Sequence, residues 1–117
     1  MSKPVGPYTP IVRADGWLVL SGQVGTRDGK LVEGGTQPQL RQALDNLRAL
    51  LESEGASMTD VVKTTVFLRH LSDYAAMNET YVEAFGDHRP ARSAVGVTEL
   101  PLGALAEIEA WAYIGDA

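Results

Sequence analysis

The stretch AEIEAWAYI, residues 106–114, decides the fold because its two faces require different neighbours. Successive side chains of an extended strand point to opposite faces. One face is small and aliphatic, which predicts packing against helices: Ile108, Ala110, Ala112 and Ile114. The other face sets aromatic rings beside carboxylates: Glu107, Glu109, Trp111 and Tyr113. Because that mixture suits neither open water nor the core of a single chain, we predict that another subunit covers it in a homo-oligomer.

Further strands are predicted N-terminal to this stretch, at residues 11–13, 17–22, 60–70 and 91–97. The strand at 60–70 is rich in β-branched residues, and we expect one apolar face through Val62, Val66 and Leu68, with Thr64 between them. The dipeptide at residues 28–29, Asp-Gly, is typical of a hairpin turn.

Two helices are predicted between the strands by apolar residues spaced three and four apart. The first has Thr36 as its N-cap and stops at Gly55. Its apolar stripe consists of Leu40, Ala43, Leu44, Leu47, Leu50 and Leu51. The second covers residues 73–85, with a stripe of Tyr74, Met77, Tyr81 and Phe85. The order β-β-α-β-α-β-β predicts an α/β (α+β) fold in which a mixed sheet carries both helices on one face.

The composition predicts a single domain, residues 1–117, with an irregular proline-containing arm over residues 1–10. The net charge of −5 and the scattered basic residues disfavour nucleic-acid binding, which depends on clustered cations. The absence of cysteine excludes a disulfide or a thiol nucleophile and suits the cytoplasm, where we expect the protein. We find no membrane-spanning stretch and no signal peptide in the sequence.

The motif RPARSAVGV, residues 89–97, raises the first question about function. Alternation places Arg92, Ala94 and Gly96 on one face, so a permanent cation lies beside a strip with little side-chain bulk. If the last two strands form a hairpin about residues 98–105, Arg92 shares a face with Glu107, although a one-residue slip would reverse this. Two interpretations stay open: an ion pair at a subunit contact, or an arginine that holds a substrate carboxylate beside a glutamate that places water.

Other polar residues have ordinary structural explanations when they are taken one at a time. Ser21 at the end of a strand is expected to bond to backbone, and Tyr8 in the arm is expected to pack. Asn78 lies at the edge of the second helical stripe, which favours a surface position. His70 and His88 lack the spacing of a metal site, so no metal is predicted.

Taken together, seven motifs in order resemble the RidA (YjgF-type) reactive intermediate deaminase family. They are GPYTP, SGQVG, QALDNLRALLESEGAS, DVVKTTVFLRHLSDYAAMNETY, RPARSAVGV, LP and EIEAWA, and they cover nearly the whole chain. The resemblance implies a chorismate-mutase-like subunit in a homotrimer, with ligand pockets between subunits. It also implies a metabolite damage-control activity: hydrolysis of 2-enamine and 2-imine acids, such as 2-aminoacrylate and 2-iminobutyrate, to 2-keto acids and ammonia. No cofactor is implied, because an imine is already activated.

The resemblance also carries site residues over to this sequence. Arg92 matches the arginine that binds the substrate carboxylate, and Glu107 matches the glutamate that positions water. Tyr8, Ser21 and Asn78 match residues that shape the pocket and bind substrate. The sequence departs from many members at two positions: Ala94 stands where they carry cysteine, and Val19 where they carry an aromatic residue.

Three alternatives remain open from the sequence. The first is a non-catalytic trimer that binds small carboxylates or acts as a chaperone. The second is a pathway-specific deaminase of a larger enamine. The third is a ribonuclease, which the acidic charge disfavours.

Overall fold

The structure, a computed structural model, describes residue 4 and residues 6–115. Over these residues the elements follow in the order β1 (Ile11–Ala14), β2 (Trp17–Val24), β3 (Thr26–Arg27), β4 (Lys30–Leu31), α1 (Thr36–Ser53), β5 (Val61–Leu68), α2 (Tyr74–Phe85), β6 (Ala91–Gly96) and β7 (Ala106–Tyr113). Short 3₁₀ turns precede β5, α2 and β7. Residues 1–3 and 5 of the predicted arm lie outside the described residues, and residues 6–10 are irregular.

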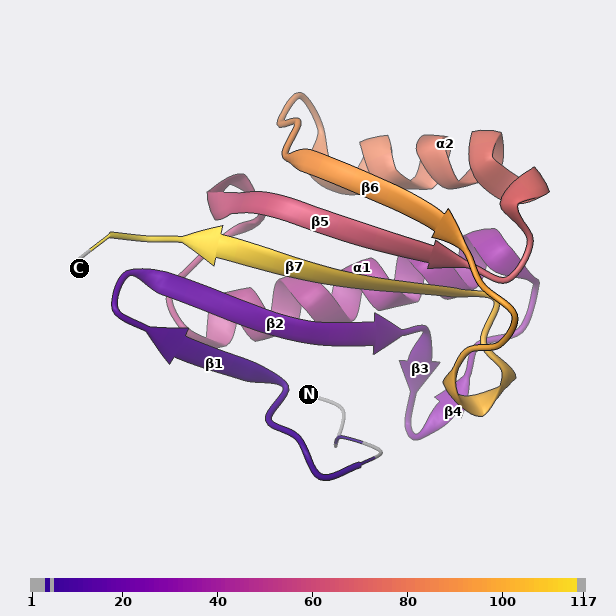
Figure 1. The fold of residues 1–117 in the computed structure, drawn as a ribbon, viewed down its shortest axis with the longest axis horizontal. Helices are drawn as coiled ribbons and strands as arrows, with labels where there is room; N and C mark the ends of the chain where they lie inside the picture. The colour runs from indigo at the N-terminus through magenta and orange to yellow at the C-terminus, as the bar shows by residue number, and fades with distance from the viewer. Residues whose placement is uncertain (1–3, 5, 116–117) are drawn as a thin grey trace.

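The main sheet has the strand order β1-β2-β7-β5-β6 (Figure 1). Neighbouring strands are antiparallel except β5 and β6, which are parallel and joined through α2. Both helices lie behind the sheet in Figure 1, and the face toward the viewer is uncovered. The predicted mixed sheet with both helices on one face is therefore confirmed. The short β3–β4 hairpin turns at the predicted Asp-Gly dipeptide.

The core lies between α1, α2 and the sheet, and it is built from the predicted helical stripes and alternate strand residues. Its largest fully buried side chains are Leu18, Leu20, Leu40, Leu44, Leu47, Leu51, Leu68, Met77, Ile108, Val61, Val66 and Thr64. Burying a leucine side chain contributes roughly 1.5–3 kcal/mol, so this interface holds most of the apolar free energy of the fold. Because the core occupies one face of the sheet, the other face remains available to a partner.

The start of α1 differs from the prediction that Thr36 is its N-cap. The N-cap is Gly35, whose φ of 97° favours glycine, and Thr36 is the first helical residue. The Thr36 side chain instead donates a hydrogen bond of 2.6 Å to Asp73 Oδ2, immediately before α2. The hydroxyl therefore joins the two helices rather than capping its own.

Val62 was expected on the buried face of β5, and this prediction is wrong. The pairing of β5 with β7 shifts between Val61 and Lys63, which inserts an extra residue into the strand. Val61 is consequently buried and Val62 is exposed, while Thr64, two residues further on, faces the helices. The same alternation correctly predicts the burial of Val66 and Leu68. It fails at the bulge because the extra residue there breaks the period of two.

The last two strands do not form the hairpin that would have placed Arg92 and Glu107 on one face. β7 pairs with β2 and β5, and β5 lies between β7 and β6. The register aligns Arg92 with Thr64 and Ala110, whereas it aligns Glu107 with Phe67. Since aligned residues share a face, Arg92 faces the helices and Glu107 lies on the uncovered face.

Candidate functional site

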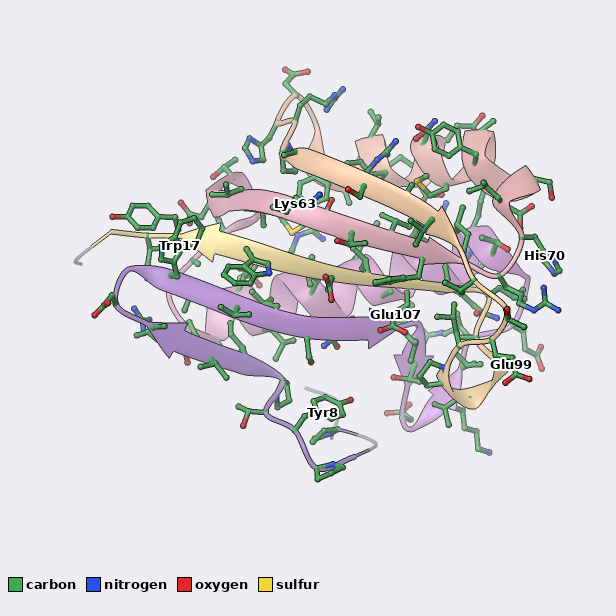
Figure 2. The ribbon with its side chains drawn as sticks, viewed as in Figure 1. Tyr8, Trp17, Lys63, His70, Glu99 and Glu107 are labelled. Atoms are coloured by element: carbon green, nitrogen blue, oxygen red, sulfur yellow. The ribbon has the colours of Figure 1, made fainter. Side chains whose placement is uncertain are left out.

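A pocket of about 220 Å³ opens beside the first residues of β7. It is lined by Tyr8, Ser21, Gly22, Val24, Pro101 and Glu107. Figure 2 places Glu107 on the uncovered face of the sheet and Tyr8 on the N-terminal arm beside the same end of β2. Three of the predicted site residues, Tyr8, Ser21 and Glu107, therefore meet in one pocket.

The arm is held against β2 at Ser21. The backbone N–H of Ser21 donates to the Pro10 carbonyl at 2.9 Å, and the Ser21 hydroxyl donates to the same oxygen at 3.2 Å. This confirms the expected bond from Ser21 to backbone, and it fixes the direction in which the chain leaves toward Tyr8. Ser21 thus shapes the pocket in two ways: it lines the pocket itself, and it holds in place the arm that carries Tyr8, which also lines the pocket.

Glu107 is a half-buried carboxylate that forms neither an ion pair nor a hydrogen bond with the other described residues. Burial raises the pKa of Glu107, and the negative charge of Glu109 on the same face of β7 raises it further. A carboxylate with a raised pKa is a better proton acceptor than an ordinary one. Glu107 is therefore suited to general acid–base work.

Arg92 lies on the other side of the sheet, against α2. Its Nη2 donates to the Tyr74 hydroxyl at 3.0 Å, and its Nη1 lies 3.5 Å from Met77 Sδ. The guanidinium carbon is 4.8 Å from the centre of the Tyr81 ring, and the Tyr81 hydroxyl bonds to buried Thr64 at 2.7 Å. A rigid aromatic surface therefore supports the guanidinium plane.

No carboxylate lies within ion-pair distance of Arg92 among the described residues. The guanidinium has five N–H donors, and the bonds above use only two of them. A half-buried cation without a counter-charge is costly unless a partner or ligand supplies one. An anion would be the complementary ligand for this arrangement.

Asn78 is half-buried on α2, one turn after Tyr74, so it lies on the same side of the helix as the contacts of Arg92. The five predicted residues fall into two groups: Arg92 and Asn78 on the helical side, and Tyr8, Ser21 and Glu107 around the pocket. Arg92 and Glu107 are two strands and three residues apart, which puts their backbones roughly 14 Å from each other. One chain does not bring the two groups together.

Two further residues contact these two groups and were not predicted from the sequence: Tyr74 beside Arg92 and Gly22 beside Glu107. Tyr74 was expected in the apolar stripe of α2, but its side chain is 44% exposed and its hydroxyl accepts the hydrogen bond from Arg92. Gly22 lies so close to Glu107 that a Cβ atom there would collide with the Glu107 side chain. Its place in the Ser-Gly-Gln motif was a signal for a close approach, whereas nothing in the sequence marked Tyr74.

The histidines take no part in either group. His70 is exposed, and His88 bonds to the Val61 carbonyl at 2.7 Å. Within residues 4 and 6–115, no three histidine or acidic side chains form a cluster that could hold a metal ion. No helix in that part of the chain has the length and apolar character needed to cross a membrane.

Comparisons with known proteins agree on one family. The sequence profile described as endoribonuclease L-PSP matches residues 1–114. A RutC family protein of Pyrococcus horikoshii is 46% identical over 113 residues, which cover 95% of this chain and 90% of the relative. The human protein named 2-iminobutanoate/2-iminopropanoate deaminase is 42% identical over 113 residues, which cover 95% of this chain and 82% of that protein.

A solved structure gives the same answer. The crystal structure of RidA from an Antarctic Psychrobacter superposes with a TM-score of 0.92 at 39% identity, covering 96% of this chain and 92% of that one. Identity of this extent along nearly the full chain confirms the resemblance stated from the motifs. The chain therefore belongs to the endoribonuclease L-PSP family, which is the YjgF/RidA family.

Proposed function

We propose that this protein hydrolyses 2-imino and 2-enamino acids of the size of 2-aminoacrylate and 2-iminobutyrate to 2-keto acids and ammonia. The observation that carries the proposal is the pair of unmatched groups: a half-buried arginine without a carboxylate and a half-buried carboxylate without a cation. The names of curated relatives support the same reaction class. The substrate brings the carboxylate that Arg92 lacks and the electrophilic carbon beside it.

The complete site forms between two copies of the chain in a homotrimer. Arg92 lies on the edge strand β6, and the pocket of Glu107 opens on the uncovered face of the same sheet. Because the two groups are on opposite faces, only a neighbouring copy can place its pocket against Arg92. The uncovered face is also large and partly aromatic, with Trp17, Trp111 and Tyr113 between 37% and 47% exposed.

In this site Arg92 binds the substrate carboxylate through two parallel N–H donors, each contributing about 1.5–3 kcal/mol. An enamine first takes a proton on its terminal carbon and becomes the imine. Glu107 accepts a proton from water as the water oxygen bonds to the imine carbon and the C=N electron pair moves to nitrogen. Glu107 returns this proton to the nitrogen, which gives a carbinolamine. The hydroxyl proton of the carbinolamine then passes through Glu107 to the amino group, and the C=O bond forms as the C–N bond breaks and ammonia leaves.

Tyr8, Ser21 and Asn78 complete the site. Tyr8 and Ser21 surround the water near Glu107, and Asn78 lies on the helix that supports Arg92. Ala94 on β6 presents only a methyl group two residues after the arginine, so the proposed reaction uses no thiol.

The test couples a threonine dehydratase to this protein and uses semicarbazide to trap the free imine. Wild-type protein should speed keto-acid release and lower semicarbazone formation. Arg92→Ala should abolish both effects, and Glu107→Gln should lower the rate by roughly 100-fold or more. Arg27→Ala removes an exposed arginine from the β3–β4 hairpin and is the matched control, which should behave as wild type.

Full activity in Arg92→Ala would contradict the assignment of the carboxylate site. A well-folded wild-type protein that binds 2-ketobutyrate but releases no keto acid from either imine would contradict the enzymatic proposal and favour a carboxylate binder. Turnover of larger enamines alone would contradict the proposed substrate size.

A further inference from the structure

The space beside Gly22 of β2 is filled by the side chain of Glu107. A Cβ atom placed on Gly22 would lie 1.8 Å from Glu107 Oε2, 2.7 Å from its Cδ and 3.1 Å from its Cγ. Gly22 is not among the glycines with positive φ, so its backbone does not itself require glycine. What the position requires is the absence of a side chain, because the carboxylate of Glu107 occupies that volume.

A bulge in β2 creates this arrangement. Leu20 pairs with Ala110 and Gln23 pairs with Ile108, so two residues of β2, Ser21 and Gly22, stand against one residue of β7. Beyond the bulge Val24 pairs with Glu107, which brings Gly22 onto the face of Glu107, one diagonal step away. The bulge thus offers Glu107 a bare stretch of backbone beside the pocket.

The structure assigns to Gly22 the role of a positioning residue: its missing side chain seats the Glu107 carboxylate at the wall of the pocket, where it meets the attacking water. This inference rests on the proposed function. The three atoms nearest to a methyl group at this position all belong to the flexible side chain of Glu107 and none to the backbone, so Glu107 can swing away while the sheet stays intact. Gly22→Ala is therefore expected to displace one carboxylate without unfolding the protein.

The position that the Glu107 carboxylate occupies beside Gly22 is called the seat below. The groups around the seat determine the pKa of Glu107 and therefore the pH dependence of the rate. Glu109 on β7 is the charged group on the same strand, and it repels the charge of Glu107. The neighbours on β2 and β5, Val24 and Phe67, do not ionise, and the arm contributes the Tyr8 phenol. Lys63, the cation of this face on β5, is bound to Ser93 at 2.7 Å. Burial, the main cause of the raised pKa of Glu107, is lost when the carboxylate leaves the seat.

The experiment compares Gly22→Ala with Arg27→Ala, which removes an exposed side chain from the β3–β4 hairpin. Gly22→Ala should lower kcat by roughly 10- to 100-fold and keep the affinity for 2-ketobutyrate, which Arg92 binds. The acidic limb of its kcat profile should move to lower pH, because a solvated Glu107 has a lower pKa. The double variant Gly22→Ala with Glu107→Gln should have the same kcat as Glu107→Gln alone. Arg27→Ala should match wild type throughout.

A wild-type rate and pH profile in Gly22→Ala would overturn the inference, and so would a loss of ligand affinity or assembly that accompanies the loss of rate. The pKa of Glu107, followed by NMR of carbon-13-labelled glutamate, gives a result that does not depend on turnover. If the wild type hydrolyses no imine, the proposed function fails. The inference about Gly22 is then still tested by the pKa of Glu107. A lower pKa in Gly22→Ala than in wild type would support it, and an unchanged pKa would refute it.

Discussion

Arg92 carries a positive charge that the described residues of its own chain do not balance. Its direct contacts are a phenol, a thioether and an aromatic ring, all of which fix the orientation of the guanidinium without neutralising it. An arginine held in this way is prepared to receive an anion, because little side-chain freedom is left to lose on binding.

Tyr74→Phe tests this preparation. The change removes the oxygen that accepts from Arg92 Nη2 and keeps the ring, so we expect the KM for 2-iminobutyrate and the Kd for 2-ketobutyrate to rise roughly 2- to 10-fold, with little change in kcat. Tyr113→Phe is the matched control, because Tyr113 is 47% exposed against 44% for Tyr74. Equal affinity in wild type and Tyr74→Phe would show that the hydroxyl does not orient the arginine.

Glu109→Gln tests the electrostatics of the pocket. In the proposed reaction Glu107 acts as a base, so activity is lost as the pH falls through its pKa. Removing the negative charge of Glu109 lowers that pKa, and we expect the acidic limb of kcat/KM to move to lower pH. Initial rates across a pH series at constant ionic strength give the result. A limb that stays in place, or moves upward, would contradict the repulsion between the two carboxylates.

The helices α1 and α2 are tied to each other at their N-terminal ends by the hydrogen bond from Thr36 to Asp73. We expect Thr36→Val to lower the free energy of unfolding by about 1–2 kcal/mol, because it removes a hydrogen bond to a charged group. Urea unfolding at fixed protein concentration measures the change. Thr98→Val, which alters an exposed loop threonine, should have little effect.

The same substitution combined with Asp73→Asn identifies the mechanism. If Thr36 bonds to Asp73, the two substitutions are coupled, and their combined effect differs from the sum of the single effects. If Thr36 capped its own helix, the effects would add. Additivity would therefore restore the interpretation that the sequence first suggested.

The sequence predicts an element well where its pattern is local. Both helices, and the strand alternation at Ile108, Ala110 and Ala112, follow from residues within a few positions of each other. Prediction from the sequence fails where a bulge changes the period, as at Val62, and where the pairing of strands distant in the sequence decides the structure. The insertion of β5 between β6 and β7 is an example of such long-range pairing, because no pattern between residues 97 and 106 indicates it.

At the scale of the whole molecule, the same insertion separates the candidate site into two parts. The motifs identified the family correctly, but neither motif nor spacing assigned Arg92 and Glu107 to opposite faces. That separation comes from the sheet order and the register. An assembly of copies is then a requirement of the proposed chemistry, beyond any contribution that it makes to stability.

Subunit mixing tests this requirement. Arg92→Ala and Glu107→Gln chains, each inactive alone, should regain about a quarter of the wild-type rate when they are unfolded together and refolded as mixed trimers, because about one interface in four then joins an intact arginine to an intact glutamate. Wild type mixed with the double variant is the control. It should retain about a quarter of the rate for sites between chains and about half for sites within a chain. Persistent inactivity of the first mixture would contradict the shared site.

The aromatic end of the uncovered face has a practical consequence. Both tryptophans of the chain lie there, with the rings of Trp17 and Trp111 6.1 Å apart, at the end of the sheet away from Glu107 (Figure 2). Indole fluorescence responds to contact with water, so in the proposed assembly these tryptophans would report subunit dissociation. Dilution should shift the emission to longer wavelength as these rings meet solvent, and the midpoint of that shift would give the dissociation constant of the assembly without any attached label.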